Sequence, residues 1–187
     1  MKKISILKPR PEEIRDLEEV DSFEFKIGRN GVILRTTELY MCVAVALYDR
    51  NSQTGAIIHD MIADPSLEEK IQKFLEATGG GITDIVITGG AISKRYAEKL
   101  TRAIEENLAH VRETIEKKFK DRAKIFYHPS SNDTATVLSL DTREEIFTIL
   151  VGPDERDGPQ PNFVPQKLII KNGREKWQIG KKLSKTV

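Results

Sequence analysis

The chain has 187 residues, of which 39% are hydrophobic and 32% are charged, and this suits one globular domain, or one domain with an appendage. Its 30 Lys and Arg residues balance 29 Asp and Glu residues, so the net charge of +1 gives no reason to expect a nucleic-acid-binding or polybasic membrane protein. No apolar run approaches the roughly 18 residues needed to span a bilayer, and the opening segment is too short for a signal peptide. We therefore expect a cytoplasmic protein without membrane insertion.

The residues that could bind a metal are few and scattered. The chain has one cysteine, Cys42, and three histidines, His59, His110 and His128. One cysteine cannot form an internal disulfide, and these spacings lack the clustering of a structural zinc site. We expect no structural metal, and we interpret His110 and His128 as surface or hydrogen-bonded residues without a catalytic role.

Composition divides the chain into three segments. Residues 1–21 form a predicted leader, in which Ile14, Leu17 and Val20 fall at the spacing of a short surface helix. Residues 22–151 carry strand and helix patterns and form the predicted domain. Their order, rich in strands at both ends with helices between, predicts an α/β (α+β) protein with a mixed sheet packed by helices.

Within the domain, alternating apolar residues at 23–27, a turn at 28–31 and apolar residues at 32–34 predict a hairpin. Almost continuous apolar runs at 41–48 and 54–62 predict two buried strands. Ser66 and Glu69 have the form of a capping box before a helix. The later elements are a strand at 82–88, a long helix with an apolar stripe over 96–119, and strands near 123–128, 134–141 and 145–151.

Residues 152–187 are predicted to be a linker followed by a basic tail. The Gly- and Pro-rich stretch at 152–161 cannot hold a regular element. Beyond it, Asn172 and Gly173 join two short strands, because this pair accepts the positive φ angles of a type I′ turn. From residue 163 onward there are seven Lys or Arg and one Glu. We interpret the tail as a hairpin packed on the domain, with a docking arm for a partner as the alternative.

The candidate chemistry centres on Cys42. A cysteine nucleophile needs a base that takes its proton, and a third group that orients the base. His59 is the histidine that lies in an apolar segment next to that of Cys42, so two neighbouring strands could bring the thiol and the imidazole together. A buried cysteine and a histidine bonded to a backbone carbonyl are the structural alternative.

The stretch from Thr36 to Asp49, with Gly55 to His59 after it, resembles the CheD family of chemoreceptor glutamine deamidases. In that family a threonine lies six residues before the cysteine and a histidine seventeen after it, and Thr36, Cys42 and His59 match both intervals. The segment 87–91 is similar to the Gly-Gly-Ala segment of the family, and 132–140 fits its closing strand region more loosely. The resemblance covers residues 30–150.

The resemblance implies a mixed β-sandwich layered by helices, related to the catalytic domain of cytotoxic necrotizing factor toxins. It also implies a cysteine-dependent protein-glutamine deamidase without a cofactor, in which Cys42 is the nucleophile, His59 the base and Thr36 the residue that orients the imidazole. The expected partners are a glutamine-bearing protein substrate, such as a chemoreceptor, and a regulatory protein. Because the long apolar stripe is needed for the core, we expect a monomer.

Two residues depart from the pattern of the family. Its members usually carry Gly-Ser directly before the cysteine, and this chain has Tyr40 and Met41. If the glycine of the family has a positive φ, Tyr40 either carries strain of about 1 kcal/mol or more, or adopts a different local backbone. A non-catalytic binding protein with the same fold, and a cysteine hydrolase of another amide or ester, therefore stay open as alternatives.

Overall fold

The computed structural model describes residues 17–60, 65–93, 95–153, 164 and 166–179. The first sixteen residues of the predicted leader and most of the predicted linker, 154–161, lie outside this range.

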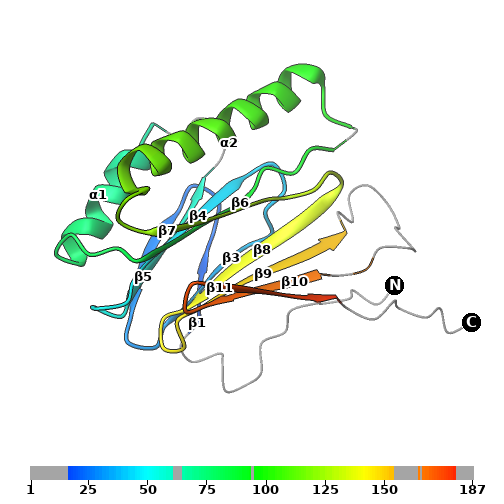
Figure 1. The fold of residues 1–187 in the computed structure, drawn as a ribbon. Coiled ribbons are helices and arrows are strands. Elements are labelled where there is room, and N and C mark those ends of the chain that lie inside the picture. The colour runs from blue at the N-terminus through cyan, green and yellow to red at the C-terminus, as the bar shows by residue number, and fades with distance from the viewer. Residues whose placement is uncertain (1–16, 61–64, 94, 154–163, 165, 180–187) are drawn as a thin grey trace, which may run out of the picture.

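Within the described residues the strands form two sheets (Figure 1). The six-stranded sheet has the order β1 (Leu17–Val20), β3 (Ile33–Thr36), β8 (Thr134–Asp141), β9 (Ile146–Pro153), β10 (Gln166–Lys171) and β11 (Arg174–Ile179). The five-stranded sheet has the order β2 (Phe25–Arg29), β5 (Thr54–Asp60), β4 (Val43–Asp49), β6 (Asp84–Gly89) and β7 (Lys124–Pro129). The helices are α1 (Leu67–Ala77) and α2 (Glu98–Phe119). The structure confirms the predicted mixed α+β class.

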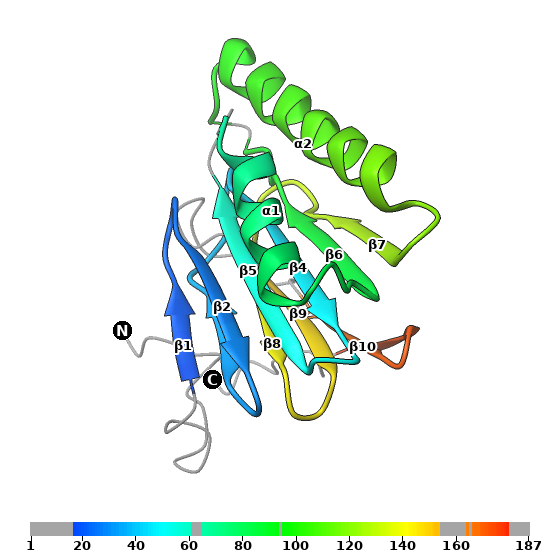
Figure 2. The same cartoon turned by 90° about the vertical axis from the view of Figure 1, so that its left-hand side faces the viewer.

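The five-stranded sheet lies in the middle, with both helices on one face and the six-stranded sheet on the other (Figures 1 and 2). Each strand in its centre is buried along its whole length, because successive side chains point alternately to the two covered faces. In β4, Val43, Val45 and Leu47 pack with the helices, whereas Ala44 and Ala46 join the core between the sheets. This two-sided burial explains the continuous apolar run read at 41–48.

The predicted hairpin at 23–34 is wrong. The segments 25–29 and 33–36 are strands, but β2 pairs with β5 in one sheet, and β3 pairs with β1 and β8 in the other. The turn at Asn30 and Gly31, both with positive φ, therefore carries the chain from one sheet to the other. Alternation predicts where a strand lies, but it does not select the partner of the strand.

The segment 17–20 is a strand and not the predicted helix. β1 pairs in parallel with β3, in a register that places Val20 opposite Thr36, and Val20 is fully buried. Apolar residues three apart are compatible with a helix. Here, however, the backbone N–H and C=O groups of the segment form their hydrogen bonds with the edge of β3, so the segment is a strand. The six-stranded sheet thus begins inside the segment that the sequence assigned to a leader.

The C-terminal hairpin extends the same sheet. β10 pairs with β9 on one side and with β11 on the other, all antiparallel. Its turn has φ of 52° at Asn172 and 66° at Gly173, as a type I′ turn requires. Leu168 and Ile170 are buried in the core between the sheets, so the hairpin packs on the rest of the molecule through apolar contact.

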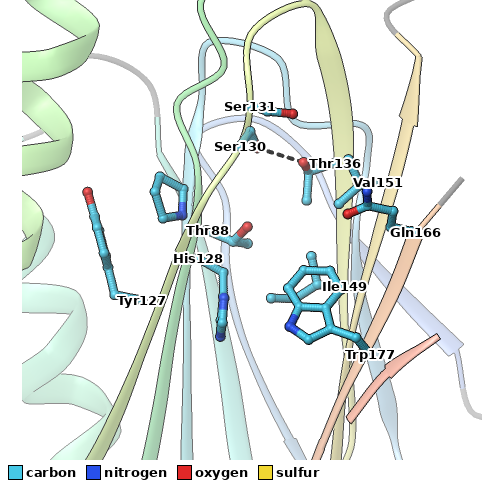
Figure 3. A pocket seen from close by; sticks show the side chains of 11 residues that line it. Thr88, Tyr127, His128, Ser130, Ser131, Thr136, Ile149, Val151, Gln166 and Trp177 are labelled. Carbon is cyan, nitrogen blue, oxygen red and sulfur yellow. Dashed lines mark hydrogen bonds between the residues drawn. The ribbon is translucent and has the colours of Figure 1, made fainter. Parts of the chain in front are cut away.

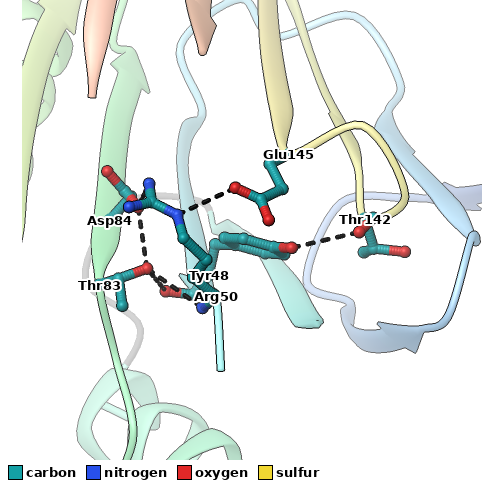
Figure 4. A network of polar contacts seen from close by, with 6 residues as sticks. All are labelled: Tyr48, Arg50, Thr83, Asp84, Thr142 and Glu145. Atoms are coloured by element: carbon teal, nitrogen blue, oxygen red, sulfur yellow. Dashed lines mark hydrogen bonds and ion pairs between the residues drawn. The ribbon is translucent and has the colours of Figure 1, made fainter. Parts of the chain in front are cut away.

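A polar network joins the two sheets at the end of β4 that is remote from Cys42 (Figure 4). The Arg50 guanidinium binds the carboxylates of Asp84 and Glu145, each at 2.9 Å. The Tyr48 hydroxyl donates a hydrogen bond to the Thr142 carbonyl at 3.2 Å, and burial raises the pKa of Tyr48 to about 12. Asp84 is almost fully buried, and the Arg50 guanidinium is the ion-pair partner of its carboxylate.

Candidate active site

Cys42 lies directly before β4, where the chain enters the central sheet. Its carbonyl accepts the N–H of Gly90 at 2.8 Å, and the Tyr40 carbonyl accepts the N–H of Ala91 at the same distance. Gly89 has a φ of +101°, and a methyl group added there would overlap the Cys42 carbonyl oxygen. The Gly-Gly-Ala segment therefore holds the backbone that carries the cysteine. The sequence marked this segment but did not reveal this role.

The φ angle of Tyr40 is not positive, so Tyr40 does not adopt the backbone conformation that only a glycine would take easily here. The strain read as one option from the sequence is therefore absent at Tyr40. Cys42 is 8% exposed and is counted among the buried residues of the core between the sheets.

His59 is fully buried near the end of β5. Its Nδ1 lies 3.1 Å from the Val20 carbonyl, and because a carbonyl only accepts, Nδ1 carries the hydrogen in this contact. The other nitrogen, Nε2, is buried without a hydrogen-bond partner. Burial lowers the pKa of His59 below its usual 6.5, against smaller opposing effects of the Val20 carbonyl, Asp21 and Glu24. The ring is therefore neutral at pH 7, with a bare lone pair on Nε2.

The strand register brings the imidazole and the thiol to the same face of the sheet. His59 is the direct partner of Ala44 on β4, and Cys42 lies two residues before Ala44. Ala44 and Cys42 both belong to the core between the sheets, and His59 alternates in step with Ile57 of that core. Cys42 and His59 are thus diagonal neighbours, a relation that typically separates Cα atoms by about 7–8 Å. The thiol does not hydrogen-bond to Nε2 in this structure.

Thr36 is buried on β3 and faces the same interior from the opposite sheet, in step with Leu34. Its hydroxyl accepts the N–H of Leu138 at 3.0 Å. The Val20 carbonyl accepts the hydrogen bond that fixes the imidazole. Val20 is the strand partner of Thr36 in the β1–β3 register. Thr36 therefore lies beside the group that holds His59, while its hydroxyl binds β8.

Sequence reasoning missed two residues of this region. Val20 was assigned to a surface helix of the leader, and its carbonyl is the partner of the imidazole. Thr88 was one residue of a predicted strand; it is the β6 partner of Ala44, and its buried hydroxyl has no hydrogen-bond partner. Every residue has a backbone carbonyl, so the sequence does not mark the one that binds the imidazole. A threonine in a predicted strand likewise shows no difference from other strand threonines.

Among the residues that the structure describes, no group of three His, Cys, Asp or Glu side chains could hold a metal ion. Neither of the described helices is long and apolar enough to cross a membrane.

Fold and site together define an α+β protein of two facing sheets, with a cysteine and a neutral imidazole buried on one face of the central sheet. No family model matches the chain. It is 26% identical over 130 residues to the "Probable chemoreceptor glutamine deamidase CheD" of Methanosarcina barkeri, covering 62% of this chain and 84% of that protein. This similarity supports a distant CheD-like relationship.

Proposed function

We propose that the protein is a cysteine-dependent deamidase that converts glutamine side chains of a protein substrate to glutamate. The observation that carries this proposal is the buried Nε2 of His59, which has a free lone pair on the face of the sheet that also presents Cys42. A cysteine nucleophile needs a base that can come within hydrogen-bond reach of the thiol, and this neutral nitrogen is the candidate base on the face that carries Cys42. The similarity to a probable chemoreceptor glutamine deamidase supports the choice of glutamine as the substrate group.

In the proposed mechanism, Nε2 of His59 takes the proton of the Cys42 thiol. The thiolate attacks the carboxamide carbon, and the imidazolium then gives its proton to the departing nitrogen, which leaves as ammonia. The resulting thioester is attacked by a water molecule that His59 deprotonates. The C–S bond then breaks, glutamate is released, and the imidazolium returns its proton to the Cys42 thiolate. The backbone N–H of Cys42 is the proposed donor to the oxyanion in both steps.

The proposal requires a small movement on substrate binding. Thiol and imidazole lie on one face without a hydrogen bond, and such catalytic bonds often close only in the substrate complex. Rotation of the Cys42 side chain and a shift of Tyr40 and Met41 would expose the sulfur and turn it toward Nε2. In this scheme Thr36 is a positioning residue, because it pairs with the segment whose Val20 carbonyl holds the imidazole.

The test measures ammonia and the +1 Da mass shift of glutamine-bearing peptides from chemoreceptor helices. Wild type is expected to release ammonia, whereas Cys42→Ala and His59→Gln are expected to be inactive. His110→Gln is the matched control and is expected to keep activity, because His110 is exposed on α2, which covers the face of the central sheet opposite to the one that carries Cys42. Equal behaviour of wild type and Cys42→Ala on a broad panel of such peptides would contradict the proposal.

A further inference from the structure

The C-terminal hairpin forms one edge of the six-stranded sheet, and among the described strands β11 pairs with β10 alone. The two-residue type I′ turn of this hairpin joins the Lys171 carbonyl to the Arg174 N–H. Hydrogen-bonded and non-bonded pairs alternate along an antiparallel ladder, so the backbone N–H and C=O groups of Glu175, Trp177 and Ile179 point away from β10. These groups can pair with a further strand.

Apolar side chains stand on the inner face of β11, which looks toward the five-stranded sheet. Trp177 is the partner of the buried Leu168, and Ile179 follows two residues later on the same face. Trp177 is 47% exposed and Ile179 is 76% exposed; with Phe23 they are the large apolar side chains that the described residues leave exposed. Exposed apolar side chains along an edge strand mark a surface to which another chain can bind.

A pocket of about 190 Å³ lies between the two sheets beside this face (Figure 3). Trp177 and Ile149 line it from the six-stranded sheet, and His128 lines it from β7. The Trp177 ring meets the His128 ring edge-on, with centroids 5.8 Å apart, and a Glu175 carboxylate oxygen lies 2.9 Å from Nε2 of His128. These contacts hold β11 against the second sheet, so a partner meets a preorganised edge. The pocket beside Trp177 offers space for an apolar side chain of that partner.

The outer face of the hairpin is basic. Its four cations share this face, because in the strand register they alternate with Leu168 and Ile170, whose side chains are buried between the sheets. They are Lys167, Lys171, Arg174 and Lys176. Within the described part of the chain, Lys171 alone has an ion-pair partner, the Glu144 carboxylate at 3.3 Å. The other three cations are available to carboxylates of a neighbouring strand.

These charges select the partner. A second copy of this chain, paired edge to edge, would bring two basic faces together, and like charges on neighbouring strands are destabilising. A strand that alternates acidic and apolar residues instead directs its carboxylates to the outer face and its apolar side chains to the inner face. One extended segment then complements both faces of β11.

We propose that the edge of β11 binds an extended acidic segment of another protein, which adds to the six-stranded sheet as an antiparallel strand. Its carboxylates meet Arg174 and Lys176 on the outer face. Its apolar residues alternate with them and cover Trp177 and Ile179 on the inner face. This docking site is independent of the proposed deamidase activity. It lies beyond residues 30–150, over which the sequence resembles the CheD family.

The first test titrates the full-length protein with a capped synthetic peptide that alternates glutamate and valine. Trp177, the one tryptophan of the chain, is the fluorescent reporter. A saturable change that weakens as salt is added is expected, because exposed ion pairs are screened. The matched peptide alternates lysine and valine, and it should bind about tenfold more weakly or not at all. No saturable change with the acidic peptide, or equal affinity for the basic one, would overturn the proposal.

Methylation of the peptide backbone tests whether the segment adds as a strand. In the antiparallel arrangement, the valines opposite Trp177 and Ile179 direct their N–H groups to β11, whereas the glutamate N–H groups point to solvent. Methylating the valine nitrogens should therefore abolish binding, and methylating the glutamate nitrogens should preserve it. Equal affinity of the two methylated peptides would show that no strand is added, and the proposal would fail.

Two charge reversals in the protein locate the site. Lys176→Glu should weaken binding of the acidic peptide about twofold to tenfold, because it turns an attraction into a repulsion. Lys99→Glu is the matched control: it changes the net charge equally, and Lys99 is exposed on α2, on the far side of the central sheet from β11 (Figure 1). Equal weakening by both variants would assign the binding to net charge alone and contradict the proposed site.

Sedimentation tests the second copy as the alternative occupant. The wild type should sediment as a monomer at the concentrations of the titration. Ile179→Pro removes an N–H that faces the edge and no hydrogen bond to β10, so it should abolish binding of the acidic peptide. A wild-type dimer that Ile179→Pro dissociates would assign this edge to a second copy and overturn the proposal.

Discussion

Gly89→Ala tests the inference that the Gly-Gly-Ala segment holds the backbone of Cys42. Gly89 has a φ of +101°, and its α-carbon lies so close to the chain that an added methyl group would overlap the Cys42 carbonyl oxygen. The neighbouring Gly90 N–H binds that same oxygen at 2.8 Å. An alanine cannot be accommodated unless the strand that begins after Cys42 moves away.

Two costs add in this variant. A non-glycine residue with positive φ costs about 1–2 kcal/mol. Forcing extra volume against a packed backbone costs about 1–3 kcal/mol more, because a main-chain oxygen cannot rotate aside as a side chain can. We therefore expect Gly89→Ala to lower the free energy of unfolding by about 2–5 kcal/mol.

Gly79→Ala separates the two costs. Gly79 also has a positive φ, +64°, but nothing lies within 4 Å of an added methyl group. Its substitution should therefore show the backbone cost alone. Urea denaturation followed by circular dichroism measures both variants. If the two lose the same stability, Gly89 does not press on Cys42 and the reasoning about this contact is refuted. Ammonia release at a temperature where both variants stay folded should fall in Gly89→Ala and persist in Gly79→Ala.

Two further predictions concern stability. Because burial lowers the pKa of His59 below 6.5, the unfolded chain binds a proton at a higher pH than the folded chain; the free energy of unfolding should be level at higher pH and decrease as the pH falls through 6.5. Urea titrations at a series of pH values check this, and His59→Gln should remove that part of the slope; an unchanged slope would assign it to other groups. Arg50→Ala should lower the free energy of unfolding by about 1–3 kcal/mol, since it leaves the buried Asp84 without its cation. Arg102→Ala, which breaks an exposed pair with Glu98, should cost less than about 0.5 kcal/mol, and equal losses would show that Asp84 does not need Arg50.

Much of the central sheet can be predicted from the sequence, because burial on two faces leaves a local signal. The apolar run at 41–48 covers β4 except for its last residue, the run at 54–62 contains β5, and the stripe over 96–119 contains α2. The spacing of Cys42 and His59 predicts neighbouring strands, and the β4–β5 pairing confirms this part of the reasoning. Activity of the pair stays a prediction.

The capping box illustrates a weaker local signal. Ser66 precedes α1 as expected, but its side chain makes no capping hydrogen bond. Residue types indicate where a helix begins more reliably than they indicate which atoms satisfy its first turn.

The sequence by itself determined which segments are strands and helices in the centre of the molecule, because alternation and helical spacing are local properties of the chain. Only the tertiary structure decided that β2 and β3 enter different sheets, that the Val20 carbonyl binds the imidazole, and that Thr88 lies opposite Ala44 on the neighbouring strand. These relations join positions far apart in the chain. They depend on which strand edges and which apolar faces need a partner. That is decided by the packing of the whole molecule and not by any single segment.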